Sequence, residues 1–193
     1  GGLHIFSVPN LKSMIKNGYS NAMNFEHPYF LEESMIDYLL KKNGFKILKK
    51  KKYLNHSIFY KTKKTTNNPK KINVYRKFEI NKRLFKDYYR NLKKDINLIN
   101  KKIKTYQNVY LFGAHIFSQM LIFNGLDISL IKNILDNDKK KHNQYLYGTK
   151  IKVVGTKNLR KVDKPIIILR AAQYSNEIKK DILKNINYKT RFI

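Results

Sequence analysis

A carboxylate and an imidazole stand side by side at Glu26 and His27, within the segment 24–30. The segment is expected to be a loop between a strand end and a helix, where open α/β sheets hold ligands. Histidine titrates near neutral pH and suits general-base work. Pro28 favours an extended His27, and neighbours in an extended chain point in opposite directions. One side chain can therefore face a ligand while the other anchors the loop. The alternative is a loop histidine that bonds only to the backbone.

A glycine and an acid mark the ends of two apolar runs in the last third of the chain. Gly113 follows the run 108–112, where a glycine lets a ligand approach the backbone and a helix N-terminus favours an anion. Asp136 ends the next run, about 20 residues on, where an acid can bond a ribose hydroxyl. The next glycine is Gly125, so the full Gly-x-Gly-x-x-Gly fingerprint is absent. The pattern fits a nucleotide site, and equally a Rossmann-like fold that binds nothing.

The chain has 193 residues with five His and no Cys. The lack of Cys excludes disulfides, thiolate zinc sites and cysteine nucleophiles in this chain. No two histidines have the i, i+4 spacing of a helical metal site, so we predict no metal site. His4 lies in an apolar run and suits a core position. His56 begins a strand and can reach the same cleft as His27, whereas His142 falls in a charged loop with no assigned role.

The charge of the chain is strongly basic. Lys and Arg number 41 and Asp and Glu number 13, which gives a formal net charge of +28. Such a charge is typical of nucleic-acid binders. We favour dispersed surface charge, because the basic residues are spread along the chain and only 49–52 and 139–141 form runs. The joint abundance of Lys, Asn, Ile and Tyr also matches the bias of an AT-rich genome. A cationic surface can still attract phosphate-bearing small molecules.

The first third of the chain predicts a strand, a helix and a pair of strands that must position the Glu26–His27 segment. Residues 4–8 predict a buried strand. Residues 31–40 place apolar side chains on one helical face, and Gly44 follows as a C-terminal cap. Residues 45–48 and 57–60 predict two strands joined through the lysine run. These elements are too few for a complete parallel domain with both faces covered, so they predict the tail of one.

A long helix and a small βαβ domain are predicted for the rest of the chain. Residues 63–71 are polar and indicate a linker. Over 74–103 apolar residues recur mostly at steps of three or four, which predicts one long amphipathic helix. A strand, turn, helix and strand over 108–135, with further strands at 151–154 and 165–169, predict a small parallel sheet.

Several short segments, taken in order, resemble a family of S-adenosylmethionine-dependent sugar C-methyltransferases. Where that family has Tyr-His-Glu-His, this chain has Asn-Phe-Glu-His at 24–27, so Glu26 and His27 alone carry over. The first matching segment is Gly-Leu-His-Ile-Phe-Ser-Val-Pro-Asn at 2–10. The others lie at 25–27, 44–45, 56–58, 112–114, 136–138, 148–149, 171–174 and 177–178.

The resemblance implies a fold class and a domain organisation. Members of the family have a zinc-binding Cys module, a class I methyltransferase domain and a C-terminal Rossmann-like domain. The expected fold is α/β: the C-terminal part of a class I methyltransferase-like sheet (1–63), a linker and long amphipathic helix (64–104), and a small Rossmann-like parallel-sheet domain (105–193). The chain begins with Gly1 and not Met, and we expect the cofactor motif and the zinc module to lie upstream of it.

The resemblance also implies chemistry. Members act on nucleotide-linked keto-deoxysugars and take their methyl group from S-adenosylmethionine. His27 is expected to remove the proton next to the ketone, and Glu26 to orient His27 or hold a sugar hydroxyl. Without its cofactor half, this chain alone is expected to be inactive. The expected substrate-binding residues are Asn10, Tyr29, His56, Gly113, Asp136 and Tyr174.

Two other functions stay open. One is a non-catalytic α/β module that holds a nucleotide or a partner. The other is a nucleic-acid binder, which the dispersed charge disfavours. No uncharged apolar stretch of about 18 residues and no leader segment is present, so we expect no membrane span and a cytoplasmic location.

Overall fold

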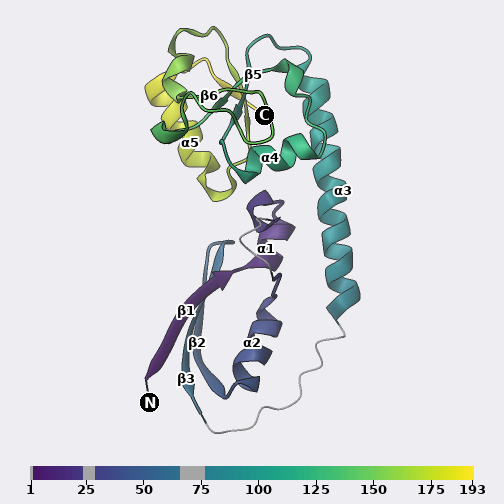
Figure 1. The fold of residues 1–193 in the computed structure, drawn as a ribbon, viewed down its shortest axis with the longest axis vertical. Helices are drawn as coiled ribbons and strands as arrows, with labels where there is room; N and C mark the ends of the chain where they lie inside the picture. Colours follow the sequence, from purple (N-terminus) through teal and green to yellow (C-terminus); the bar gives the residue numbers. More distant parts are fainter. Residues whose placement is uncertain (1, 24–28, 66–76) are drawn as a thin grey trace. The chain divides into compact units, whose positions relative to one another are not determined.

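The computed structural model describes residues 2–23, 29–65 and 77–193. It divides into two compact units, Gly1–Tyr89 and Arg90–Ile193. The expected linker falls mostly, and Glu26 and His27 fall entirely, outside the described residues. The fold class predicted from the sequence is confirmed: a three-stranded antiparallel sheet, a long helix and a five-stranded parallel sheet (Figure 1).

The first unit is built on a sheet with the strand order β1-β3-β2. The strands are β1 (Leu3–Pro9), β2 (Phe45–Tyr53) and β3 (Ser57–Lys64), and β3 pairs antiparallel with both of the others. Helix α2 (Glu33–Lys42) covers one face, where Ile36 and Leu40 pack with Ile58 and Tyr60. Between β1 and α2 lie a short helix α1 (Leu11–Lys16) and a 3₁₀ turn η1 (Ser20–Met23), in a region whose weak periodicity predicts little more than a loop.

The other face of this sheet is exposed, and three expectations for the first unit are corrected. Residues 4–8 do form a strand, but it is not buried, and Ile5 is 66% exposed. His4 lies on the face that α2 covers, where its ring stacks on Phe6, but it is exposed and not a core residue. The lysine run 49–52 lies inside β2 and does not form the connection between the strands. As a result Lys46 lies opposite Lys63, and Lys49 opposite Lys61. Like charges directly opposite each other destabilise a sheet.

Helix α2 ends at Lys42 with Asn43 as its C-cap, so the predicted cap Gly44 follows one residue later. Its φ of +71° is a left-handed conformation, and its N–H donates to the carbonyl of Lys41. A Cβ added there would lie 2.9 Å from the carbonyl oxygen of Thr65. Glycine is thus required for two reasons, backbone conformation and space.

We expect Gly44→Ala to lower the free energy of unfolding of the first unit by at least about 2 kcal/mol, because it combines left-handed strain with a backbone clash. Gly18→Ala is the matched control: its φ is +70° but a Cβ meets nothing within 4 Å. It should cost only about 1 kcal/mol. Thermal or urea unfolding measures both, and equal losses would show that the Thr65 contact is unimportant.

The long helix is α3 (Phe78–Ile103), and the division between the two units falls within it. The part of the predicted helix over 74–76 lies outside the described residues, as does the rest of 66–76. The C-terminal half of α3 presents the predicted stripe: Ile96, Ile99 and Ile103 are buried in the core of the second unit. In its N-terminal half Tyr88 is buried, and its hydroxyl has no hydrogen-bond partner among the described residues.

Burial, with a smaller contribution from Tyr89, raises the pKa of Tyr88 to about 12. The fold therefore disfavours the ionised form of Tyr88: stability is unaffected by this ionisation below about pH 10 and falls as the pH rises from 10 through 12. We expect Tyr88→Phe to raise stability at pH 7 by about 1 kcal/mol, because an unsatisfied buried hydroxyl is removed. It should also flatten the fall in stability between pH 10 and 12. Tyr89→Phe, at a partly exposed neighbour, should do neither in the same denaturation series.

The second unit is a parallel sheet with the order β6-β5-β4-β7-β8. Its five strands are β4 (Val109–Phe112), β5 (Ile131–Leu135), β6 (Val153–Val154), β7 (Ile166–Leu169) and β8 (Arg191–Phe192). Its helices include α4 (Ile116–Phe123), α5 (Ser175–Asp181) and the π-helical turn η7 (Ile182–Ile186).

Both faces of this parallel sheet are covered. Val109 and Leu111 of β4 pack with α3 and α4 on one face. Tyr110 and Phe112 pack with Ile182 on the other. A parallel sheet buried on both sides needs nearly continuous apolar strands, and all residues of β4 and β7 are buried. In the part of the chain that the structure describes, no helix has the length and apolar character to cross a membrane.

Candidate functional site

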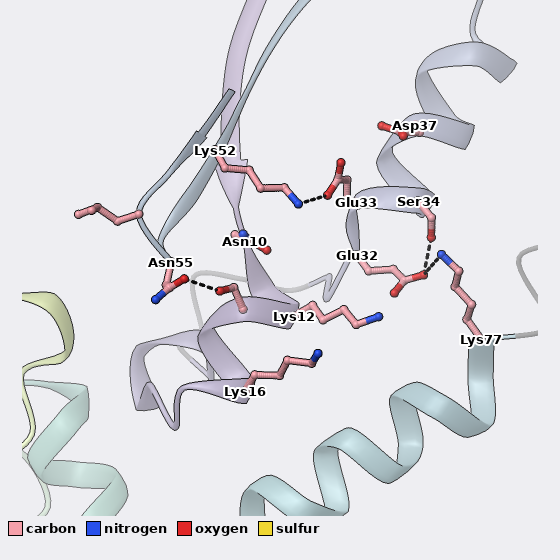
Figure 2. A pocket seen from close by; sticks show the side chains of 12 residues that line it. Asn10, Lys12, Lys16, Glu32, Glu33, Ser34, Asp37, Lys52, Asn55 and Lys77 are labelled. Atoms are coloured by element: carbon pink, nitrogen blue, oxygen red, sulfur yellow. Dashed lines mark hydrogen bonds and ion pairs between the residues drawn. The ribbon is translucent and has the colours of Figure 1, made fainter. Parts of the chain in front are cut away.

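The first unit contains a cavity of about 560 Å³ (Figure 2). We call it the cavity below. It lies where β1 ends, between α1, the turn that joins β2 to β3, and the beginning of α2. Its volume is in the range of small-molecule sites. It is lined by Asn10, Lys12, Ser13, Lys16, Glu32, Glu33, Ser34, Asp37, Lys52, Leu54, Asn55 and Lys77.

Two contacts join the end of β1 to the β2–β3 turn. The N–H of Asn10 donates to the carbonyl of His56 at 2.8 Å. The hydroxyl of Ser13 donates to Oδ1 of Asn55 at 3.0 Å. They hold α1 against the turn, although Asn10 makes no side-chain cap to the helix. The side chain of Asn10 is thus left at the cavity wall with its amide available to a ligand.

Carboxylates form the wall at the beginning of α2. Lys50 contacts Glu33 at 2.6 Å and Asp37 at 2.9 Å, and Lys52 contacts Glu33 at 3.1 Å. These lysines, chiefly through the hydrogen bond from Lys50, lower the pKa of Glu33. Glu33 is therefore ionised at neutral pH.

Glu32 continues this wall. Burial by itself would raise the pKa of Glu32, but hydrogen bonds from Ser34 and Lys77 outweigh it and the pKa is lowered. The Nζ of Lys77 lies 3.3 Å from Oε1 of Glu32, and the carboxylate is 12% exposed. An ionised, half-enclosed carboxylate can accept further hydrogen bonds from hydroxyl groups.

Lys12 and Lys16 form the wall opposite these carboxylates, on α1. Both side chains extend from the helix in the same direction (Figure 2). In the described part of the chain neither makes an ion pair, whereas Lys52 and Lys77 do. Among many dispersed lysines, neither of these two stands out in the sequence as a binding residue. Their i, i+4 spacing directly after Asn10 was the signal that could have found them.

Of the site residues predicted in the first unit, the structure places some at the cavity and others away from it. Asn10 lines the cavity. His56 lies beside it: its backbone carbonyl binds Asn10, and its Nδ1 lies 2.6 Å from the hydroxyl of Ser57. Tyr29 is 80% exposed and does not line the cavity. The catalytic roles of Glu26 and His27 stay predictions, because residues 24–28 are not described; in the chain they connect η1 to the segment that begins the carboxylate wall.

In the second unit the structure brings Gly113 and Asp136 together. The N–H of Gly113 donates to the carbonyl of Leu135 at 2.7 Å. Oδ2 of Asp136 accepts from the N–H of Ala114 at 2.8 Å, and Oδ1 accepts from the N–H of Asp138 at 2.8 Å. Through these hydrogen bonds the carboxylate connects the turn that follows β4 with the turn that follows β5. Its role toward a ribose stays a prediction.

Two further residues complete this unit. Tyr174 ends the 3₁₀ turn η6 (Ala172–Tyr174) and is 55% exposed. His142 has no predicted role, and its Nε2 lies 2.8 Å from the carbonyl oxygen of Asp136. Its ring also packs on Gly155, where a Cβ would lie 2.8 Å from Cε1. His142 therefore supports the turn that carries Asp136.

Comparison with protein families gives one match. The family described as C-methyltransferase C-terminal domain matches residues 51–193. The chain belongs to this family. The resemblance drawn from short motifs is confirmed at that level. Comparison with curated proteins finds no match.

The match to the C-methyltransferase C-terminal domain begins inside β2 and covers β3, α3 and the whole second unit. Asn10, Lys12 and Lys16 lie before it. Methyltransferase families generally use S-adenosylmethionine. The described residues do not fit such a cofactor: Gly113 stands without a glycine-rich loop, and both oxygens of Asp136 are taken by backbone N–H groups. Among these residues no group of three or more His, Asp or Glu could hold a metal ion.

Proposed function

We propose that the chain is the C-terminal portion of an S-adenosylmethionine-dependent methyltransferase that C-methylates a nucleotide-linked deoxysugar. The cofactor-binding half is then supplied by sequence outside this chain. Membership of the C-methyltransferase family supports the reaction type. The cavity at the end of β1 carries the proposal for the acceptor site, since it is lined by Asn10, α1 and the beginning of α2, and Glu26 and His27 lie between α1 and α2 in the chain.

The exposed face of the first sheet supports the division into halves. Leu3 and Ile5 of β1 and Phe59 of β3 are exposed on it. β1 is an edge strand with one described neighbour, β3. An exposed edge next to exposed apolar side chains is a template for further strands and helices. A methyltransferase sheet that continues beyond β1 would cover both.

The proposed chemistry of this chain is proton removal. A ketone acidifies the neighbouring carbon, and the neutral imidazole of His27 takes that proton and becomes an imidazolium. The resulting enolate carbon is the nucleophile, and the cofactor supplies an electrophilic methyl group. Glu26 orients the imidazole or holds a sugar hydroxyl. Asn10 positions the acceptor, and correct positioning supplies much of the rate. In the second unit, Gly113, Asp136 and Tyr174 are the residues proposed to hold the nucleotide.

The test is methyl transfer by a protein that joins this chain to its cofactor-binding half. Nucleotide-linked keto-deoxysugars are offered with methyl-labelled S-adenosylmethionine, and the product is located by mass spectrometry and NMR. We expect the label on a ring carbon, and no transfer by the 193-residue chain alone. Label on oxygen or nitrogen would replace C-methylation. Sugar binding without any transfer would favour the non-catalytic module.

A further inference from the structure

The cavity has an uneven distribution of charge. Lys12 and Lys16 stand one helical turn apart on α1, and in the described part of the chain no carboxylate lies within ion-pair distance of either. The three carboxylates of the opposite wall are already paired with Lys50, Lys52 and Lys77. Among the described residues, the positive charge of the Lys12–Lys16 wall is therefore not neutralised. The negative charge of the opposite wall is neutralised by lysines.

Resting on the proposed function, we propose that Lys12 and Lys16 bind a phosphoryl group of the acceptor substrate. Two ammonium groups at i, i+4 spacing can reach the same dianion, and lysine binds phosphate well as a point charge. Asn10, at the N-terminal side of α1, contributes an amide donor or acceptor to the same ligand. None of these three residues was assigned to phosphate binding by the sequence.

The opposite wall selects the rest of the ligand. Glu32 and Glu33 are held by lysines and keep lone pairs for hydroxyl donors, whereas the lysines of this wall already have carboxylate partners and attract a second anionic group less than Lys12 and Lys16 do. A cavity of about 560 Å³ has room for a hexose ring with one phosphoryl group, and not for a nucleic-acid strand. The ligand class is thus a sugar phosphate, with its phosphoryl group at α1 and its hydroxyls toward α2.

Calorimetric titration of the 193-residue chain tests this without any methyl transfer. The probes are glucose 1-phosphate, glucose and inorganic phosphate. We expect glucose 1-phosphate to bind more tightly than either of the others. The double variant Lys12→Gln, Lys16→Gln should weaken it at least about tenfold, because two charge-assisted hydrogen bonds are lost. The charge-keeping variant Lys12→Arg, Lys16→Arg should retain binding.

The matched control is Lys82→Gln with Lys86→Gln, which removes two lysines at the same spacing on α3, outside the cavity. It should leave the affinity within about twofold, since exposed charges that do not line the cavity are screened by solvent and salt. Equal weakening in both double variants, unchanged binding after Lys12→Gln with Lys16→Gln, or no binding of glucose 1-phosphate would overturn the proposal. Inorganic phosphate binding as tightly as the ester would overturn its sugar part. Methyl transfer by the joined protein is measured separately. Failure of the sugar-phosphate site can therefore be distinguished from failure of the proposed function.

Discussion

His27→Ala, made in a methyltransferase that contains this chain and its cofactor-binding half, is expected to lower kcat by about 10²- to 10⁴-fold. That is the range for loss of a positioned general base. The KM for the acceptor should change by less than about threefold, because the imidazole acts on the proton in the transition state and adds little to binding of the ground state. Steady-state kinetics over a range of acceptor concentrations separates the two parameters.

The pH profile sharpens this expectation. In the parent enzyme kcat should fall as the pH drops below about 6.5, where an ordinary imidazole becomes protonated. The His27→Ala variant should lose that acid limb. His4→Ala is the matched control, since His4 belongs to the same unit and does not line the cavity. If His27→Ala leaves kcat and the pH profile unchanged, His27 only bonds to the backbone and the proposed base is wrong.

Asp136→Asn is expected to destabilise the second unit by about 2–3 kcal/mol. The aspartate is 9% exposed and accepts the N–H groups of Ala114 and Asp138, and Lys141 lies 3.3 Å from its Oδ2. An amide can keep one acceptor and must turn its NH₂ toward a donor or a cation. A buried N–H that loses its partner costs about 1–3 kcal/mol, and the charge-assisted part is lost as well.

Chemical denaturation followed by the tyrosine signal or by circular dichroism measures this loss. Asp163→Asn is the control: Asp163 is 67% exposed, pairs with Lys189 at 3.4 Å, and should change stability by less than about 0.5 kcal/mol. If the two variants are equally stable, the carboxylate of Asp136 is not needed to join the turns. Its place at the strand end would then be better explained by a ligand.

The parallel unit could be predicted well from sequence for a physical reason. A strand buried on both faces must be apolar along its whole length, so 109–112 and 166–169 are visible as uninterrupted runs. The glycine and the acid that follow β4 and β5 are adjacent because parallel strands end at the same edge. The pattern could place them together. It could not show that the carboxylate would bind backbone N–H groups.

The first sheet was predicted less well because its exposed face carries apolar side chains, which a sheet with one face in solvent does not usually show. One face carries Leu3, Ile5 and Phe59 although no described element covers it, so apolar runs there indicated burial that the structure does not show. The lysines of β2 have low strand propensity and indicated a connection. Pairing with β3 overrides that propensity, since every residue of β3 finds a partner in β2.

The cavity itself was only partly predictable. Asn10 was predicted from the family resemblance. Lys12 and Lys16 lie about 20 residues from Glu32 in the chain, and only the fold brings them to the same cavity. Dispersed lysines are so common here that two useful ones do not stand out from 41 basic residues. Only the fold shows which acids have cationic partners and which lysines face a ligand-sized space.

The two lysine pairs that face each other across β2 and β3 have a practical consequence. Their mutual repulsion is a Coulomb energy that dissolved counterions reduce, over a screening distance of about 10 Å at 0.1 M. The free energy of unfolding of the first unit should therefore be higher in concentrated salt than in dilute buffer. Polyvalent anions such as sulfate should raise it further. The ionic strength of the buffer should then determine how much of this sheet stays folded in the purified 193-residue chain.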